Sequence, residues 1–397
     1  MPRLFRRVIA TSDNRAIAIA GIATCAMLLA ACTAGKSSDL PARTTGSQGH
    51  PASAAPLLKS PSSSSSPPAT GELAAPYGDT TPTEPPGQMT IAFAGDVHFA
   101  DRTATRLAED PATAFGESAA VLSRADLTMV NLETSVSVGG RPQPKSFTFQ
   151  APPTAFTALR DAGIDIATMA NNHAADFGAT GLDQTLAAIS TSHFPVVGIG
   201  KNAAQAFAPY YITHNGVRLA ILAASQVQDE TLANFSATDT SAGIASAYSD
   251  RLVAAVRGAK SKADVVIVYV HWGTEYSSCP NGDQRSLADT LAAAGATAVV
   301  GTHAHVLQGA GWRPDGTYVA YGLGNYFWWM SFGNNQDDNG VLTLTVNKDR
   351  VKAAAFDPSH LDSRGIGLPA TGSEKQRILS EWDQVRQCSG LRANPPS

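Results

Sequence analysis

Short apolar runs alternate with segments of helical periodicity from about residue 89 to the end of the chain. The runs are rich in Val, Ile, Ala and Thr, a pattern that indicates buried strands. We expect strands over 89–96, 127–133, 164–172, 217–225, 264–272, 296–305, 317–325 and 340–347. Helices are expected over 111–125, 152–163, 181–192, 248–263, 283–295 and 373–388. This alternation predicts an α/β domain.

Polar residues that can bind metal ions stand where five of these strands stop. They are Asp96 and His98, Asn131 and Glu133, Asn171 with Asn172 and His173, His271, and His303 with His305. The carboxyl ends of strands form the ligand-binding edge of an open α/β sheet, so the five clusters are expected to meet. Any one cluster is more simply explained by solvation or packing. Together they are hard to explain in that way.

The residue types in these clusters suit divalent metal ions. Residues at i and i+2 of an extended strand face the same side, so His303 and His305 are expected to face one site, with Ala304 turned away. The same geometry is expected of Asp96 and His98. Because the set contains nitrogen and oxygen ligands and no thiolate, it predicts two ions of Mn, Fe or Zn that would neutralise substrate oxygens.

Six motifs in order give the chain a resemblance to a known family. They read GDVH, NLE, NNHAAD, HWGTE, GTHAHVLQ and GLGNYFW. The order resembles the bacterial capsule-synthesis or poly-γ-glutamate biosynthesis family, often called CapA-like, which is related to the calcineurin-like metallophosphoesterases. The resemblance covers roughly residues 89 to 335. It implies a four-layer α/β/β/α sandwich with a dimetal site at the strand ends.

The resemblance also implies a role for each cluster. Asp96, His98 and His305 would hold the first metal, Asn172, His271 and His303 would hold the second, and Glu133 would bridge the two. His173 would be the general acid, or alternatively only orient Asn172, and Asp176 would orient His173.

The chain departs from the related phosphoesterases at two motifs. Glu133 stands where they carry an aspartate, so either this longer side chain bridges the metals or Asn131 contributes. The third motif is ANNHAAD in place of GNHE or GNHD, which leaves phosphoester hydrolysis open.

For several residues near the motifs, the sequence allows two different roles. Glu275 could contact substrate or be a solvated loop residue, and Asn325 is a candidate orienting residue. An aromatic group could line a pocket or pack in the core; its members are Trp272, Tyr326, Phe327, Trp328 and Trp329.

The first 88 residues are not expected to belong to the fold. Residues 1–31 combine arginines with a short apolar run, as a secretory signal does, and the run ends at Cys32 in a lipobox-like LAAC. The alternative is an ordinary signal peptide cut near Ala31. Residues 32–88 read as a Ser/Pro-rich disordered linker. The domain is then 89–397, with a motif core over 89–335 and a C-terminal extension over 336–397.

Cysteine use agrees with an exported protein. Cys279 and Cys388 remain as one pair in an oxidising compartment, where a disulfide is expected and two free thiols are the alternative. The formal charge of −4 gives no reason to expect a nucleic-acid partner.

Two functional hypotheses follow. The first is an extracytoplasmic, lipid-anchored, metal-dependent hydrolase acting on a small phosphoester or peptide, or on the amide bonds of an anionic envelope polymer. The second is a non-enzymatic accessory protein for the export or anchoring of such a polymer.

Overall fold

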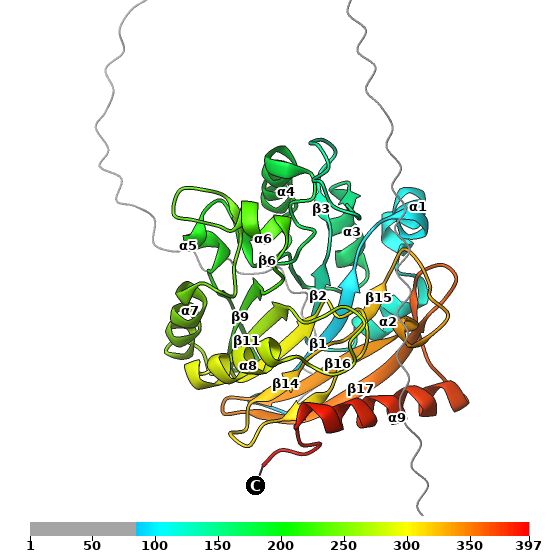
Figure 1. Ribbon diagram of the computed structural model, residues 1–397. Helices are drawn as coiled ribbons and strands as arrows, with labels where there is room; N and C mark the ends of the chain where they lie inside the picture. Colours follow the sequence, from blue (N-terminus) through cyan, green and yellow to red (C-terminus); the bar gives the residue numbers. More distant parts are fainter. Residues whose placement is uncertain (1–84, 397) are drawn as a thin grey trace, which may run out of the picture. The chain divides into compact units, whose positions relative to one another are not determined.

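Two β-sheets form the centre of the structure, a computed structural model that describes residues 85–396 (Figure 1). The expected signal peptide, Cys32 and nearly all of the expected linker lie outside the described residues. The larger sheet contains eight strands in the order β18-β17-β16-β1-β2-β5-β6, with β15 also paired to β1. Their bounds are β1 (Gln88–Val97), β2 (Leu127–Leu132), β5 (Ile166–Thr168), β6 (Val196–Val197), β15 (Asn325–Phe327), β16 (Asp338–Asn347), β17 (Val351–Leu361) and β18 (Gly367–Pro369).

The smaller sheet contains six strands in the order β13-β14-β12-β11-β9-β8. Their bounds are β8 (Tyr210–His214), β9 (Val217–Ser225), β11 (Val265–His271), β12 (Ala298–Thr302), β13 (Ala310–Trp312) and β14 (Tyr318–Ala320). Two short ribbons add β3 (Ser135–Val136) with β4 (Gln150–Ala151), and β7 (Ile199–Gly200) with β10 (Gly243–Ile244). In each large sheet the central strands are parallel, so their carboxyl ends share one edge.

Side-chain alternation along the strands builds three apolar layers. In β1, Ile91 and Phe93 enter the core between the two sheets, whereas Ala92 and Ala94 face the helices outside. In β11, Ile267 enters the same central core and its neighbours pack in the outer core of the smaller sheet. Because both faces of each sheet are buried, the strands read as continuous apolar runs.

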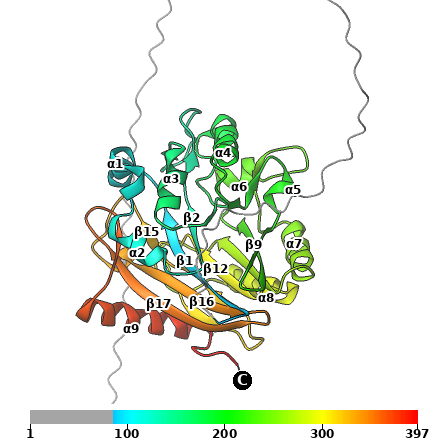
Figure 2. The same ribbon diagram turned by 180° about the vertical axis from the view of Figure 1, so that it is seen from behind.

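Helices cover the outer face of each sheet. The outer core of the larger sheet includes residues of α1 (Asp101–Glu109), α2 (Ala119–Leu122), α3 (Thr154–Asp161), α4 (Gly178–Ser192) and α6 (Glu230–Phe235). That of the smaller sheet includes residues of α5 (Ala203–Ala206), α7 (Asp250–Lys260) and α8 (Gly282–Ala294). The result is a four-layer α/β/β/α sandwich, which confirms the expected fold class (Figure 2).

The last helix, α9 (Gly372–Ser389), has a different position. It runs along β17 (Figure 1), and its Ile378 and Trp382 enter the core between the sheets. The Trp382 ring stacks on Phe356 of β17 with centroids 4.0 Å apart. The expected C-terminal extension therefore supplies strands to the larger sheet and a helix that closes the central core.

One expected helix is broken. Over 111–125 the chain forms two 3₁₀ turns, η1 (Pro111–Thr113) and η2 (Gly116–Ser118), before the short α2. The backbone of Gly116 has φ +52°, a left-handed conformation that interrupts an α-helix. Within residues 85–396, no helix has the length and apolar character needed to cross a membrane.

Candidate metal centre

The polar clusters predicted from the sequence meet where parallel strands of both sheets end. Asp96 lies near the end of β1 and Glu133 directly follows β2. His271 is the last residue of β11, and His303 directly follows β12. The two stacked sheets therefore direct their ligand-bearing ends toward one place, as the strand-end pattern predicted.

Five side chains form two overlapping groups. Glu133 lies with His303 and His305 in one group and with Asp96 and His271 in the other, and in each group the candidate ligand atoms all lie within 4.8 Å of one another. All five side chains are buried. Because Glu133 belongs to both groups, it has the position that a bridging carboxylate requires. The groups pair Asp96 with His271 and His303 with His305, whereas the resemblance pairs Asp96 with His305 and His271 with His303.

Asn172 extends the second group. Its Oδ1 lies 2.7 Å from Nε2 of His271, so an oxygen and a nitrogen that can both bind metal face each other. The other ring nitrogen of His271, Nδ1, lies 3.2 Å from the hydroxyl of Thr302 and 3.2 Å from the amide nitrogen of Asn131. If Nδ1–H donates to this hydroxyl, the Nε2 lone pair is free for a cation that Asn172 shares.

Two asparagines support the carboxylates. The Asn131 amide nitrogen donates to Asp96 Oδ1 at 2.8 Å and lies 3.4 Å from Glu133 Oε2. Its oxygen accepts a hydrogen bond of 2.9 Å from Asn171, which also donates to the carbonyl of Leu132 at 2.8 Å. Asn131 thus presents its nitrogen to the carboxylates, and this amide orientation is that of a supporting residue and not of a metal ligand.

His305 is oriented by Asn325. Its Nδ1 lies 2.8 Å from Oδ1 of Asn325 and 3.4 Å from Oδ2 of Asp96. Since Nδ1–H donates to these oxygens, Nε2 carries the free lone pair. Asn325 therefore has the geometry of the orienting residue that the sequence suggested.

The backbone around the two histidines differs from the prediction. The strand β12 ends at Thr302, and His303 and His305 have φ values of +98° and +56°, so the expected extended His-Ala-His geometry is wrong. The two rings still lie close, with centroids 5.8 Å apart. Left-handed backbone at non-glycine residues costs about 1–3 kcal/mol each and concentrates at functional sites.

His98 stands apart from both groups. Its Nε2 accepts a hydrogen bond of 3.0 Å from the backbone N–H of Trp329, and its ring stacks on Trp328 with centroids 4.0 Å apart. Its Nδ1 is buried and has no hydrogen-bond partner within residues 85–396. The structure therefore brings together six of the seven predicted ligands. In His98 the Nε2 lone pair is engaged by Trp329, and Nδ1 is the nitrogen left for a cation.

Burial sets the electrostatics of the group. Burial, with the neighbouring charge of Asp96, raises the pKa of Glu133 well above its usual value. Burial also lowers the pKa values of His271 and His303 well below the usual value, with a further contribution from other histidines. For Asp96, burial opposes ionisation, but hydrogen bonding and the charge of His305 leave its pKa lowered. Neutral imidazoles are the form that binds metal.

The residues fit divalent cations. Among the described residues, Glu133 Oε1 and His303 Nδ1 are buried polar atoms without a hydrogen-bond partner. Such atoms are costly unless a ligand satisfies them. A cation would satisfy them, favour the ionised form of Glu133 and replace the contact between Asn172 and His271. The donor set of oxygen and imidazole atoms suits Mn, Fe or Zn.

His173 and Asp176 form a pair beside the ligands. Nδ1 of His173 lies 2.6 Å from Oδ2 of Asp176, which also accepts a hydrogen bond of 2.7 Å from the backbone N–H of Phe149. The other ring nitrogen, Nε2, lies 3.9 Å from Oε1 of Glu133. Asp176 thus fixes the ring so that Nε2 faces the centre, where it can hold or release a proton.

Most of the aromatic group expected near the site belongs to the core. Trp272 packs outside the smaller sheet, and Tyr326 and Phe327 pack outside the larger sheet. Only Trp328, stacked on His98, and Trp329 lie at the site. Their ring neighbour Phe149 also contacts His173, with centroids 4.5 Å apart. Of the aromatic group, only these two tryptophans are therefore placed to line a pocket at the site.

Sequence reasoning missed Lys145. Its amine contacts the carboxylate of Asp176 at 2.9 Å and the backbone carbonyl of Asn172. A single lysine in a polar stretch gives no sequence signal of such a role, and only the folded loop brings it here.

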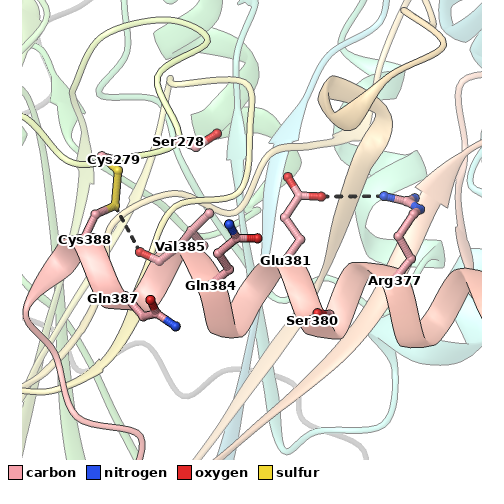
Figure 3. Close-up of a pocket in the computed structure, with 9 residues that line it drawn as sticks. All are labelled: Ser278, Cys279, Arg377, Ser380, Glu381, Gln384, Val385, Gln387 and Cys388. Carbon is pink, nitrogen blue, oxygen red and sulfur yellow. Dashed lines mark hydrogen bonds and ion pairs between the residues drawn. A yellow bond between two sulfur atoms is a disulfide. The ribbon is translucent and has the colours of Figure 1, made fainter. Parts of the chain in front are cut away.

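A disulfide joins Cys279 to Cys388, with Cα atoms 5.8 Å apart, and so ties α9 to the loop that follows His271 (Figure 3). A groove beside it is lined by residues of α9 and by Ser278, and none of its lining residues belongs to the metal centre (Figure 3). Glu275, in the same loop, is exposed.

Comparisons with known proteins agree with the motif pattern. The family model described as bacterial capsule synthesis protein PGA_cap matches residues 90–328. The PGA biosynthesis protein CapA of Bacillus subtilis is 33% identical over 180 residues, which are 45% of this chain and 46% of that protein. The capsule biosynthesis protein CapA of Bacillus anthracis is 34% identical over 202 residues, 48% of each chain. The chain therefore spans about half the length of these curated relatives.

Solved structures give more distant similarities. A hypothetical protein from Thermus thermophilus aligns with a TM-score of 0.46 and 18% identity, over 68% of this chain and 99% of that one. A structure titled as a novel phosphatase from Mycoplasma pneumoniae aligns with a TM-score of 0.43 and 14% identity, over 68% of this chain and 93% of that one. With the family model matching more than half of its length, this chain belongs to the bacterial capsule synthesis protein PGA_cap family.

Proposed function

We propose that the protein is an extracytoplasmic, lipid-anchored, metal-dependent hydrolase that acts on an anionic envelope polymer. One observation carries the proposal: carboxylate, amide and imidazole ligands from both sheets converge beside the His173–Asp176 pair. A purely structural metal site does not require a histidine whose free nitrogen faces the ligands. The names of the relatives, which refer to capsule and PGA biosynthesis, support a polymer carrying carboxylates.

The chain's own residues have distinct roles in this proposal. In the division that the resemblance implies, Asp96 and His305 would hold one divalent ion, and Asn172, His271 and His303 a second, with Glu133 between them. Two contacts support this division: His305 lies 3.4 Å from Asp96, and the ring centroids of His271 and His303 are 4.7 Å apart. Bound ions would supply Lewis-acid charge next to the oxygens of the substrate. His173 would deliver a proton from Nε2 to the leaving group, while Asp176 keeps its ring in place.

The decisive experiment combines metal analysis with hydrolysis assays. The purified protein should bind close to two equivalents of Mn²⁺ and then cleave poly-γ-glutamate, a phosphodiester or a phosphomonoester. We expect His173→Ala to keep its Mn²⁺ content and to lower kcat by about 10²- to 10⁴-fold, the usual contribution of general acid–base catalysis.

His193→Asn provides the control for this experiment. His193 is exposed after α4 at φ +53°, a backbone conformation that asparagine tolerates, so its kcat should equal that of the wild type. Unchanged activity in His173→Ala would remove the general-acid role. A metal-loaded wild type that binds poly-γ-glutamate but hydrolyses nothing would instead favour the non-enzymatic accessory role.

A further inference from the structure

Lys145 lies next to residues of the proposed centre, in the loop between β3 and β4. Its side chain is only 8% exposed, and its amine contacts two carboxylates, Asp176 at 2.9 Å and Asp229 at 3.0 Å. It also donates to the backbone carbonyl of Asn172 and lies 3.4 Å from the hydroxyl of Thr231. One buried ammonium group therefore links its own loop to two other segments of the chain, 172–176 and 229–231.

Two of these contacts reach residues that face the centre. Asp176 accepts hydrogen bonds from Lys145 through Oδ1 and from Phe149 through Oδ2, and Oδ2 also contacts His173. The carbonyl of Asn172 is held by Lys145 together with the hydroxyl of Thr231, which donates at 2.6 Å. The side chain of Asn172, on the same residue, is the one that faces His271.

The remaining contact anchors Lys145 from behind. Asp229 is the N-cap of α6, and its Oδ1 accepts from the backbone N–H groups of Thr231 and Leu232 at 3.1 Å. Its Oδ2 is left for the amine of Lys145. A lysine side chain is flexible, but with partners on several sides this one has little freedom to move.

We propose that Lys145 is a positioning residue of the metal centre, because it fixes the Asn172 backbone and the Asp176 carboxylate at the same time. Without its ammonium group, the Asn172 carbonyl keeps only Thr231, and the Asp176 carboxylate is buried with fewer donors. Both Asn172 and His173 then lose precise placement. The inference rests on the proposed metal centre and adds a residue that contacts neither metal nor substrate.

The test is Mn²⁺ binding to the purified Lys145→Met variant, measured by calorimetry and by electron paramagnetic resonance. We expect about 10- to 100-fold weaker binding of one Mn²⁺ equivalent, the usual effect of removing a residue that orients a metal ligand. The other equivalent, held by Asp96 and His305, should keep its affinity. The spectrum should change from that of a coupled Mn²⁺ pair to that of an isolated ion.

Two further variants test the contacts around Lys145. Asp229→Asn loosens Lys145 from behind but leaves its contacts to Asn172 and Asp176, so it should weaken the same Mn²⁺ equivalent less than Lys145→Met does. Thr231→Val removes the second donor to the Asn172 carbonyl and should weaken the same Mn²⁺ equivalent as Lys145→Met does.

The outcomes bear on different claims. Wild-type affinity for both equivalents in Lys145→Met would overturn the positioning role and leave the proposed centre intact. Equal weakening of both Mn²⁺ equivalents in Lys145→Met would also overturn it, because the loss would then reflect stability alone. A wild type that binds no Mn²⁺ would overturn the metal centre itself, and this inference with it.

Discussion

Two glycines let the strands of the centre approach other backbone and side-chain atoms closely. A Cβ added to Gly95 would lie 1.8 Å from the carbonyl oxygen of Gly324, and one added to Gly301 would lie 2.0 Å from Nε1 of Trp272. Gly95 directly precedes Asp96, and Gly301 lies two residues before His303. The absence of a side chain at these positions is therefore part of how the ligands are placed.

Gly301→Ala should destabilise the protein strongly. The new methyl group would displace the Trp272 indole, whose N–H donates to the carbonyl of Tyr321 at 2.8 Å. Overpacking and loss of this buried hydrogen bond should together lower the free energy of unfolding by about 3 kcal/mol or more. The measurement is urea denaturation followed by circular dichroism.

Gly258→Ala is the matched control. Gly258 lies inside α7, and a Cβ there would meet nothing within 4 Å. Alanine should raise the free energy of unfolding by up to about 1 kcal/mol, because glycine is a poor helix former. A Gly301→Ala variant as stable as the wild type would contradict the close approach at Trp272.

Individual ligands could be predicted because their chemistry is local, whereas their contacts could not. Asp96 and His271 follow apolar runs that mark strand ends. The hydrogen bond from Trp329 to His98 joins residues 231 positions apart, and nothing in either segment indicates it. The contacts of Lys145 are also non-local and are made by a loop whose conformation the sequence pattern does not determine.

At the scale of elements, the disulfide connects α9 to a loop of the centre. This loop carries Tyr276, whose ring lies 6.2 Å from that of His305, and Cys279 follows three residues later. Arg285 of α8 adds hydrogen bonds to the carbonyls of Cys388 and Ser389. The end of α9 is thus held by both covalent and polar contacts.

Removal of the disulfide should lower stability. The bond closes a loop with a sequence separation of 109, and cross-links of this kind stabilise proteins by about 2–4 kcal/mol. We expect the Cys279→Ala/Cys388→Ala double variant to lose about this much free energy of unfolding in urea. Reductant should destabilise the wild type to the same level and leave the double variant unaffected. A wild type insensitive to reductant would contradict the prediction.

The positions of strands could be predicted from the sequence where both faces of the strand are buried. All eight expected strands overlap observed strands, because continuous apolar runs mark strands covered on both faces. The long strand β17 was not predicted. Its residues are largely half-buried or exposed, and Pro358 interrupts its pattern, so its sequence lacks the apolar run of a central strand.

At the scale of the whole molecule, the family match stops short of the folded unit. It ends at residue 328, yet β16 pairs with β1 along six residues and β17 pairs with β16. The central core also includes side chains from α9. The segment 336–396 is therefore integral to the sandwich, a conclusion that motif matching alone could not give because the motifs lie at the strand ends.

Attachment of the protein to the membrane through a lipid on Cys32 is a further prediction. If Cys32 carries the lipid, Cys32→Ser should abolish labelling by a radioactive or clickable fatty acid and move the protein from the membrane fraction to the soluble one. Cys25, within the expected signal peptide, offers the control, and Cys25→Ser should change neither result. Continued labelling of the Cys32→Ser protein would contradict the lipobox assignment.

The central place of β1 also affects the time course of folding. β1 is the first strand of the described chain and ends at Val97. One of its neighbours, β16, begins at Asp338, 241 positions later. At roughly 5–20 residues per second, a ribosome needs about 12–48 s to make this stretch. For all of that time β1 lacks one of its partners, so the larger sheet cannot be completed until β16 has been made. If the chain is exported as we propose, this delay would leave its larger sheet incomplete while the first part of the chain is already made.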